Sequence, residues 1–280
     1  MGGIWLCHGK TAAVPYYVEQ ADVRLYSYEE LCYFIYHNLY LFGREMLTES
    51  FVRWLERDLE LPGLAGDIRE MVRQNTELVH IMERIFEDAP YLNAQEVQKA
   101  AKMLRTILNE PESVKRKKRG DRYVELHRYE AGIREYRQIL KEEGAEAYDG
   151  FYAQVYHNLG AACARMFRFK EASEYYMQSY RLKKDPEVML AFTAALRLGL
   201  PAELYAGLIQ RGQATKQQAD EVEKRLQELR ELNRSGAEAQ ELERVLARAG
   251  EDERGELLAI TGDWKREFRK NIQGACVGSR

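Results

Sequence analysis

The hydrophobic positions of the chain follow a helical period from Ser27 almost to its end. In YEELCYFIYHNLYLF, residues 28–42, the apolar residues recur at intervals that place them on one helical stripe: Leu31, Ile35, Leu39 and Phe42. Ser27 and Glu30 are typical of a capping box at the start of this helix. The pattern predicts a helix from residue 28 onward.

Further helices follow at short intervals. Thr48 is expected to cap a second helix with Phe51, Trp54 and Leu55 on its buried side, and Pro62 is expected to begin a third. The same periodicity predicts helices over 76–88 and 93–109. Residues 1–110 are therefore expected to form an N-terminal helical block of stacked hairpins.

The first 26 residues differ from the rest of the chain. GIWLC and ADVRLYS are short runs of apolar, β-branched or aromatic residues, and they favour a small hairpin within 3–26. Seven tyrosines precede position 41. They fit either a core or an interface with hydrated hydroxyl groups.

Two glycines mark an internal repeat. Gly120 and Gly160 lie forty positions apart, and large and aromatic residues follow both at the same offsets. Antiparallel helices approach closely where one presents a small residue to a bulky group on the other. We expect Gly160 to face Ala172 across one such contact, and Gly120 to face Gly132 across another.

The segment VYHNLGAACARMFRFKEASEYYMQSYRLKKDP resembles the tetratricopeptide repeat (TPR) family. The residues that carry the resemblance are Tyr156, Leu159, Gly160, Ala172 and Tyr176. It implies an all-α solenoid with repeats at 113–146 and 153–186 and a degenerate third at 187–210. The N-terminal block also resembles that of small uncharacterised bacterial TPR proteins, for which no activity is implied.

The resemblance implies a non-enzymatic scaffold that binds a peptide or protein segment in the inner groove of the stack. The first helices of the repeats would line this groove. The expected groove residues are Lys117, Lys118, Asp121, Gln154, His157, Asn158, Arg165 and Phe192.

One particular ligand class is disfavoured by the same resemblance. Some TPR proteins bind the acidic C-terminal peptides of heat-shock chaperones through a clamp for two carboxylates. The first helices of three successive repeats supply its residues: Lys and Asn from one, Asn from the next, and Lys and Arg from the third. Lys117 and Asn158 match this clamp, but Asp121, Val188 and Phe192 do not. We therefore expect a different ligand, whose identity the residues leave open.

Residues 213–273 have a different character. Ala219, Val222, Leu226 and Leu229 form a short heptad seam, supported by an i,i+4 pair of Glu221 and Arg225. A second apolar stripe contains Leu257, Trp264, Phe268 and Ile272. These helices either cap the solenoid or join two chains in a homodimer.

Composition and motifs indicate an ordinary soluble protein without catalytic chemistry. Hydrophobic residues make up 45% of the 280, and the formal charge is −3. The opening MGGIWLCHGK lacks the features of a secretory signal, and the scattered Cys7, Cys32, Cys163 and Cys276 indicate free thiols, so we expect a cytoplasmic location. No catalytic, cofactor or metal-binding motif is present, and we expect neither enzymatic activity nor a bound cofactor.

The run KRKKR, residues 115–119, is the sharpest charge feature. It fits a solvated helix balanced by nearby acids such as Asp121 and Glu125, an acidic partner segment, or nucleic acid. The net negative charge makes nucleic acid an unlikely partner of the whole molecule.

Overall fold

The computed structural model describes residues 9–89, 92–142, 148–234, 236, 240, 243–246 and 253–273. The described chain is mostly helical and confirms the all-α expectation. It divides into two compact units, 1–122 and 123–280. In the described part, no helix has both the length and the apolar character that crossing a bilayer takes.

The first unit begins with a small hairpin. Strand β1 (Tyr16–Val18) pairs antiparallel with β2 (Val23–Leu25), and Tyr16 lies opposite Leu25. The second strand falls inside the predicted ADVRLYS and its partner is YYV, while the predicted GIWLC lies outside the described residues. In the turn between the two strands, Asp22 adopts φ +55° and accepts a hydrogen bond from the Tyr17 hydroxyl at 2.7 Å.

Short helices build the remainder of this unit. They are α1 (Tyr28–His37), the 3₁₀ turns η1 (Leu39–Leu41) and η2 (Arg44–Met46), α2 (Glu49–Arg53) with its π-helical extension η3 (Trp54–Asp58), α3 (Pro62–Arg73), α4 (Leu78–Glu87), α5 (Ala94–Asn109) and α6 (Glu112–Glu125), whose last residues belong to the second unit. Their fully buried side chains include Leu31, Ile35, Phe51, Leu55, Ile68, Ile81, Met82 and Ile85.

Most predicted helix starts in this unit are confirmed. The Thr48 side chain accepts from the Phe51 amide, Pro62 opens α3, and Asn93 forms a full capping box with Glu96. The Ser27 side chain accepts from the Glu30 amide as predicted, and the Glu30 carboxylate accepts from the amide of Tyr26.

The first helix is shorter than its apolar stripe predicts. It ends at His37, and Leu39 lies in the separate turn η1. Asn38 leaves the helical conformation with φ −136°, and its side chain donates to the Phe34 carbonyl and accepts from Arg122. These side-chain bonds offer the backbone an alternative to another helical turn.

The tyrosines before position 41 divide between core and surface. The hydroxyl of the buried Tyr28 donates to the Ile85 carbonyl, and that of Tyr16 donates to the Met46 carbonyl. Tyr33, in contrast, is 59% exposed on α1. Several of these rings therefore belong to the fold of the first unit.

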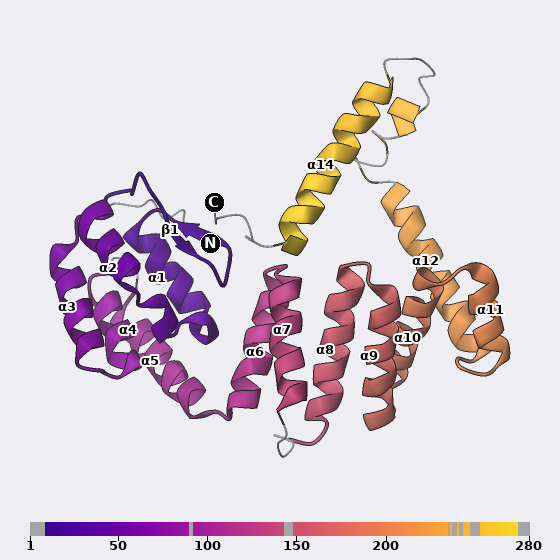
Figure 1. Cartoon of the computed structure of the whole chain (residues 1–280), viewed down its shortest axis with the longest axis horizontal. Coiled ribbons are helices and arrows are strands. Elements are labelled where there is room, and N and C mark those ends of the chain that lie inside the picture. The colour runs from indigo at the N-terminus through magenta and orange to yellow at the C-terminus, as the bar shows by residue number, and fades with distance from the viewer. Residues whose placement is uncertain are drawn as a thin grey trace. The chain divides into compact units, whose positions relative to one another are not determined.

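The second unit contains a row of helices. Its elements are α7 (Tyr129–Lys141), α8 (Phe151–Arg165), α9 (Phe169–Leu182), α10 (Pro186–Gly199), α11 (Ala202–Gln210), α12 (Lys216–Arg234) and α14 (Glu253–Gln273). Helices α7, α8, α9 and α10 pack each on the next, and we call these four the helix row (Figure 1). Helix α12 packs on α10, and α14 contacts α7.

Candidate functional site

The turns that enter α7 and α9 have the same backbone geometry. His127 and Phe167 both adopt φ +59°. The amide of Arg128 donates to the Tyr123 carbonyl at 2.7 Å, and that of Arg168 donates to the Cys163 carbonyl at 3.0 Å. The forty-residue spacing seen in the sequence is thus repeated in the chain's conformation, residue for residue, at these two turns.

Glycine allows the close contact inside the second helix pair. A Cβ atom on Gly160 would lie 2.9 Å from the Tyr176 ring and 3.2 Å from the Ala172 carbonyl oxygen. Ala172 and Tyr176 are themselves buried. The predicted contact of Gly160 with Ala172 is therefore confirmed, and its bulky side is Tyr176.

The other predicted repeat residues are buried or partly buried. Gly120 and Gly132 are buried in α6 and α7, and Gly120 precedes the end of α6 by the same interval as Gly160 precedes the end of α8. Leu159 is buried as expected. Tyr156 is only half-buried, and its ring lies 6.4 Å from that of Tyr175 of α9.

One face of helix α8 is more exposed than the side that contains Val155, Leu159 and Cys163. Gln154 and Arg165 are exposed on it, and His157, Asn158 and Ala161 are half-buried; we call these five residues the open face of α8. The opposite side includes Val155, Leu159 and Cys163, whose side chains are fully buried. Sequence reasoning placed Gln154, His157, Asn158 and Arg165 on this face, and the structure brings them together there.

The polar groups of the open face are positioned by neighbours in the same unit. The Tyr148 hydroxyl donates to Gln154 at 3.0 Å, and the Arg165 guanidinium lies 5.9 Å from the centre of the Tyr129 ring. The interaction of a cation with a ring face holds the Arg165 side chain in place without removing its charge from solvent.

His157 is the most perturbed polar group on this face. Its ring lies 5.6 Å from that of Tyr176, and its Nδ1 is buried without a hydrogen-bond partner among the described residues. Burial lowers the pKa of His157, although the carboxylate of Asp185 acts in the opposite direction. Burial therefore favours the neutral form of the ring.

Phe192 does not belong to this surface. It was expected to add contact area to the groove, but it is only 5% exposed. It shares a face of α10 with Val188, Ala195 and Gly199, and Gly199 packs directly on Phe169 of α9. Phe192 is buried because this face of α10 is turned towards α9.

Three further predicted groove residues lie in the first unit and already have partners there. Lys117 pairs with Asp121 at 2.9 Å, and Lys118 pairs with Glu110 at 2.6 Å and donates to the Tyr40 hydroxyl. Lys118 also lies 5.1 Å from the centre of the Tyr40 ring. These side chains hold α6 within its unit.

The rest of the basic run is paired within the same unit. Lys115, Arg116 and Arg119 all pair with Glu112. Lys115 and Arg119 lower the pKa of Glu112 although its partial burial opposes this. Sequence reasoning named Asp121 as a balancing acid but missed Glu110 and Glu112, which lie only a few positions before the run.

The buried cysteines are poor nucleophiles. Cys32 and Cys163 are free thiols in the core, as expected. Burial raises the pKa of Cys163 to about 12 and that of Cys32 further still. Cys7 and Cys276 lie outside the described residues.

The C-terminal seam is buried only at its beginning. Val222 is 3% exposed where α12 packs on α10, and Arg197 of α10 pairs with Glu223. The predicted pair of Glu221 and Arg225 is present at 2.7 Å. Leu229, farther along, is 54% exposed.

The second apolar stripe is only partly described. Leu257 is half-buried on α14 and Trp264 is 38% exposed, while the side chains of Phe268 and Ile272 lie outside the description.

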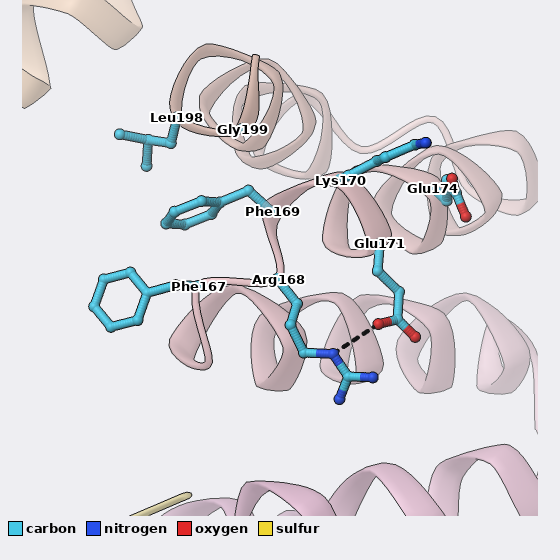
Figure 2. A pocket seen from close by; sticks show the side chains of 8 residues that line it. All are labelled: Phe167, Arg168, Phe169, Lys170, Glu171, Glu174, Leu198 and Gly199. Carbon is cyan, nitrogen blue, oxygen red and sulfur yellow. Dashed lines mark ion pairs between the residues drawn. The ribbon is translucent and has the colours of Figure 1, made fainter. Parts of the chain in front are cut away.

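A hollow of about 450 Å³ lies where α9 begins and α10 ends. We call it the edge hollow; it is lined by Phe167, Arg168, Phe169, Lys170, Glu171, Glu174, Leu198 and Gly199. Figure 2 shows Phe167, Phe169 and Leu198 on one side of it and Lys170 and Glu174 on the other. No feature of the hydrophobic pattern indicated this site, because its residues meet only through the contact of α9 with α10.

Comparisons with protein-family models, with curated proteins and with solved structures find no match to this chain. Within the described ranges, no cluster of His, Cys, Asp and Glu is arranged to hold a metal ion.

Proposed function

We propose that the chain is a TPR-like adaptor without enzymatic activity, which binds a peptide or protein segment along the open face of α8. The repetition of the α6–α7 turn in the α8–α9 turn supports this proposal more than any other observation. Such repetition is typical of helical solenoids, whose extended faces bind other molecules.

The chemistry of the open face favours a polar stretch of a partner that carries a single negative charge. Gln154 and Asn158 supply amide donors and acceptors, and a neutral His157 adds one more polar group. Arg165 places a single positive charge at the end of the face. A segment with free backbone hydrogen-bonding groups and one acid would match this arrangement.

The test is selection of peptides from a random library on the full chain, followed by measurement of their affinity for variants. We expect Gln154→Ala and Asn158→Ala to weaken binding by about tenfold together, since each removes a hydrogen bond to the peptide. Gln178→Ala is the matched control, because Gln178 is an exposed amide on α9 of the same pair. Loss of binding in the Gln178 variant alone would refute the proposal.

A second candidate function is self-association through the C-terminal helices. The exposure of Leu229, one heptad beyond the buried Val222, favours it. Light scattering of the full chain should then report a dimer that Leu229→Glu converts to a monomer. A monomer in both cases would remove this candidate.

Nucleic-acid binding through Lys115–Arg119 is the weaker alternative. All five basic side chains pair with carboxylates of their own unit, which reduces the positive charge available to a phosphate backbone.

A further inference from the structure

Another hollow lies in the first unit, where α4 ends and α5 begins. Its volume is about 540 Å³, and we call it the α4–α5 hollow. Its lining includes the apolar side chains of Phe86, Leu92 and Val97 and the charged side chains of Glu83, Arg84 and Glu87. Phe86 is buried, whereas Leu92 and Val97 are half-buried. The hollow therefore has an apolar floor that solvent can reach.

Four carboxylates share two guanidinium groups at this end of α4. The ion pairs are Arg84 with Asp67, Glu87 and Asp88, and Arg105 with Glu83. The pairs that involve Glu87 and Glu83 are wide, at 3.4 Å each, and the Glu87 side chain is 67% exposed. Exposed pairs of this kind contribute little to stability. Four negative and two positive charges leave an excess of two negative charges beside the apolar floor.

The fold itself does not favour acids at this position. The C-terminal end of a helix is the negative end of its dipole, so cations are stabilising there and carboxylates are not. Helix α4 nevertheless ends with Glu87, and Asp88 is its C-cap. The positive end of α5 does not need these acids, because Asn93 and Glu96 already form a capping box there. The stability of the two helices therefore does not explain the acids that end α4.

A long cationic side chain matches both parts of the hollow. Lysine and arginine bury their aliphatic stems on apolar surface while the charged group stays at the edge. Arginine suits two carboxylates better, because its planar guanidinium presents several N–H donors in a fixed arrangement. A stem packed on Val97 would lie in the same hollow as the carboxylates of Glu83 and Glu87.

We propose that the α4–α5 hollow binds an arginine side chain from a basic, partly apolar segment of a partner protein. The stem of this arginine packs on Phe86, Leu92 and Val97, and its guanidinium pairs with Glu83 and Glu87. The site belongs to the first unit and shares no residue with the open face of α8. It therefore stands independently of the peptide binding proposed above.

The test compares two synthetic peptides by calorimetric titration of the full chain. The probe is acetyl-Leu-Arg-Leu-Arg-Leu-amide, and in its control citrulline replaces both arginines. Citrulline keeps the shape of the arginine side chain but carries no charge. We expect the arginine probe to bind about tenfold more tightly, because only a charged guanidinium makes charge-assisted hydrogen bonds to the carboxylates.

Variants of the chain assign this binding to the hollow. Glu83→Gln with Glu87→Gln should weaken the arginine probe about tenfold and leave the citrulline peptide unchanged. Val97→Ser should weaken both peptides, since it removes apolar area from the floor. Glu77→Gln is the matched control, because Glu77 is an exposed acid at the other end of α4. It should leave both affinities unchanged.

Four results would overturn the proposal. Equal affinity for the two peptides would remove the role of charge, and an equal loss in Glu77→Gln would mean that cations are attracted to the chain without a site. Binding of spermine as tight as that of the arginine probe would assign the hollow to a small cation. The fourth result is a urea midpoint of the double glutamine variant that falls below that of Glu77→Gln, because the acids would then serve the fold.

Discussion

The helix pairs α8–α9 and α10–α11 occupy successive positions in the chain but are built differently. Gly160 brings α8 so close to α9 that any Cβ atom would meet the Tyr176 ring. Ala194 stands at the corresponding place in α10, and α11 extends only from Ala202 to Gln210. Helix α12 adds its own contacts with α10 through Arg197 and Glu223.

The two pairs differ in where their close helix contacts lie, and the small residue of α8, Gly160, is replaced by Ala194 in α10. Helix α10 keeps an intimate contact with the preceding helix, through Gly199 on Phe169, whereas its own partner α11 is short and retains Tyr205 as its buried aromatic anchor. In the α8–α9 pair, the close contact at a glycine lies between the two helices of the pair. In the next pair, the close contact is at Gly199 and lies between α10 and the preceding helix α9.

The largest effect is expected from one substitution made in both pairs. Gly160→Ala should destabilise the chain by about 2 kcal/mol, because the new methyl group overpacks against Tyr176 and Ala172. Gly207→Ala in α11 should instead stabilise it by about 1 kcal/mol, since nothing lies within 4 Å and alanine favours the helix. Urea unfolding of both variants measures the two values, and equal signs would contradict this account of the difference.

The next effect concerns a buried hydroxyl that joins α9 to α8. Ser179 is 2% exposed and donates to the Ala153 carbonyl at 2.7 Å. Ser179→Ala should cost about 1 kcal/mol of unfolding free energy. Thr193→Val is the control in α10, because the Thr193 hydroxyl donates to the Met189 carbonyl of its own helix and so joins no second helix through this bond. A larger loss of unfolding free energy in Thr193→Val than in Ser179→Ala would contradict the inference that the Ser179 hydrogen bond stabilises the α8–α9 pair.

A smaller effect is expected from the ion pairs that join α9 to α7. Glu171 pairs with Arg137 of α7 and with Arg168 at 2.9 Å, and Arg168 also pairs with Glu130. Glu171→Gln should cost about 0.5 kcal/mol at low salt and less at high salt, because these side chains are partly exposed. Glu187→Gln, which removes a wide and exposed pair with Arg225, should have no measurable effect.

The smallest effect is the pH dependence that His157 contributes. Its pKa is lowered in the folded chain, so the unfolded chain binds the proton more readily. The contribution to stability is complete above the ordinary histidine pKa of about 6.5 and is lost as the pH falls towards the folded value. His157→Gln should flatten the stability curve in that window, and an unchanged slope would show that the ring is accessible to water.

Local chemistry explains which parts of this fold were predictable. Thr48 and Pro62 mark helix starts through a bond or a dihedral preference within a few residues, and both act as predicted. The helix predicted over 93–109 also begins as expected, with Asn93 as its cap. Gly160 and Ala172 were also recognisable, because small residues in an apolar run indicate a close crossing.

The errors share a different cause, since each depends on contacts between segments. The first helix ends early because Asn38 bonds to Arg122, which is distant in the sequence. Phe192 is buried because α10 turns that face to α9, and helical spacing alone does not say which neighbour a face meets. The open face of α8 was predicted as a set, but its expected continuation through Lys117 and Lys118 is occupied by ion pairs.

The sequence by itself determined where most helices begin, which residues must be small, and that an interval of forty residues recurs. These properties arise from hydrogen bonds and steric demands between near neighbours, which the order of residues states directly. Only the tertiary structure decided which charges are neutralised, which apolar side chains stay exposed, and that Phe167 and Leu198 share one hollow. Those outcomes depend on which helices pack together, and packing brings together residues that the sequence keeps apart.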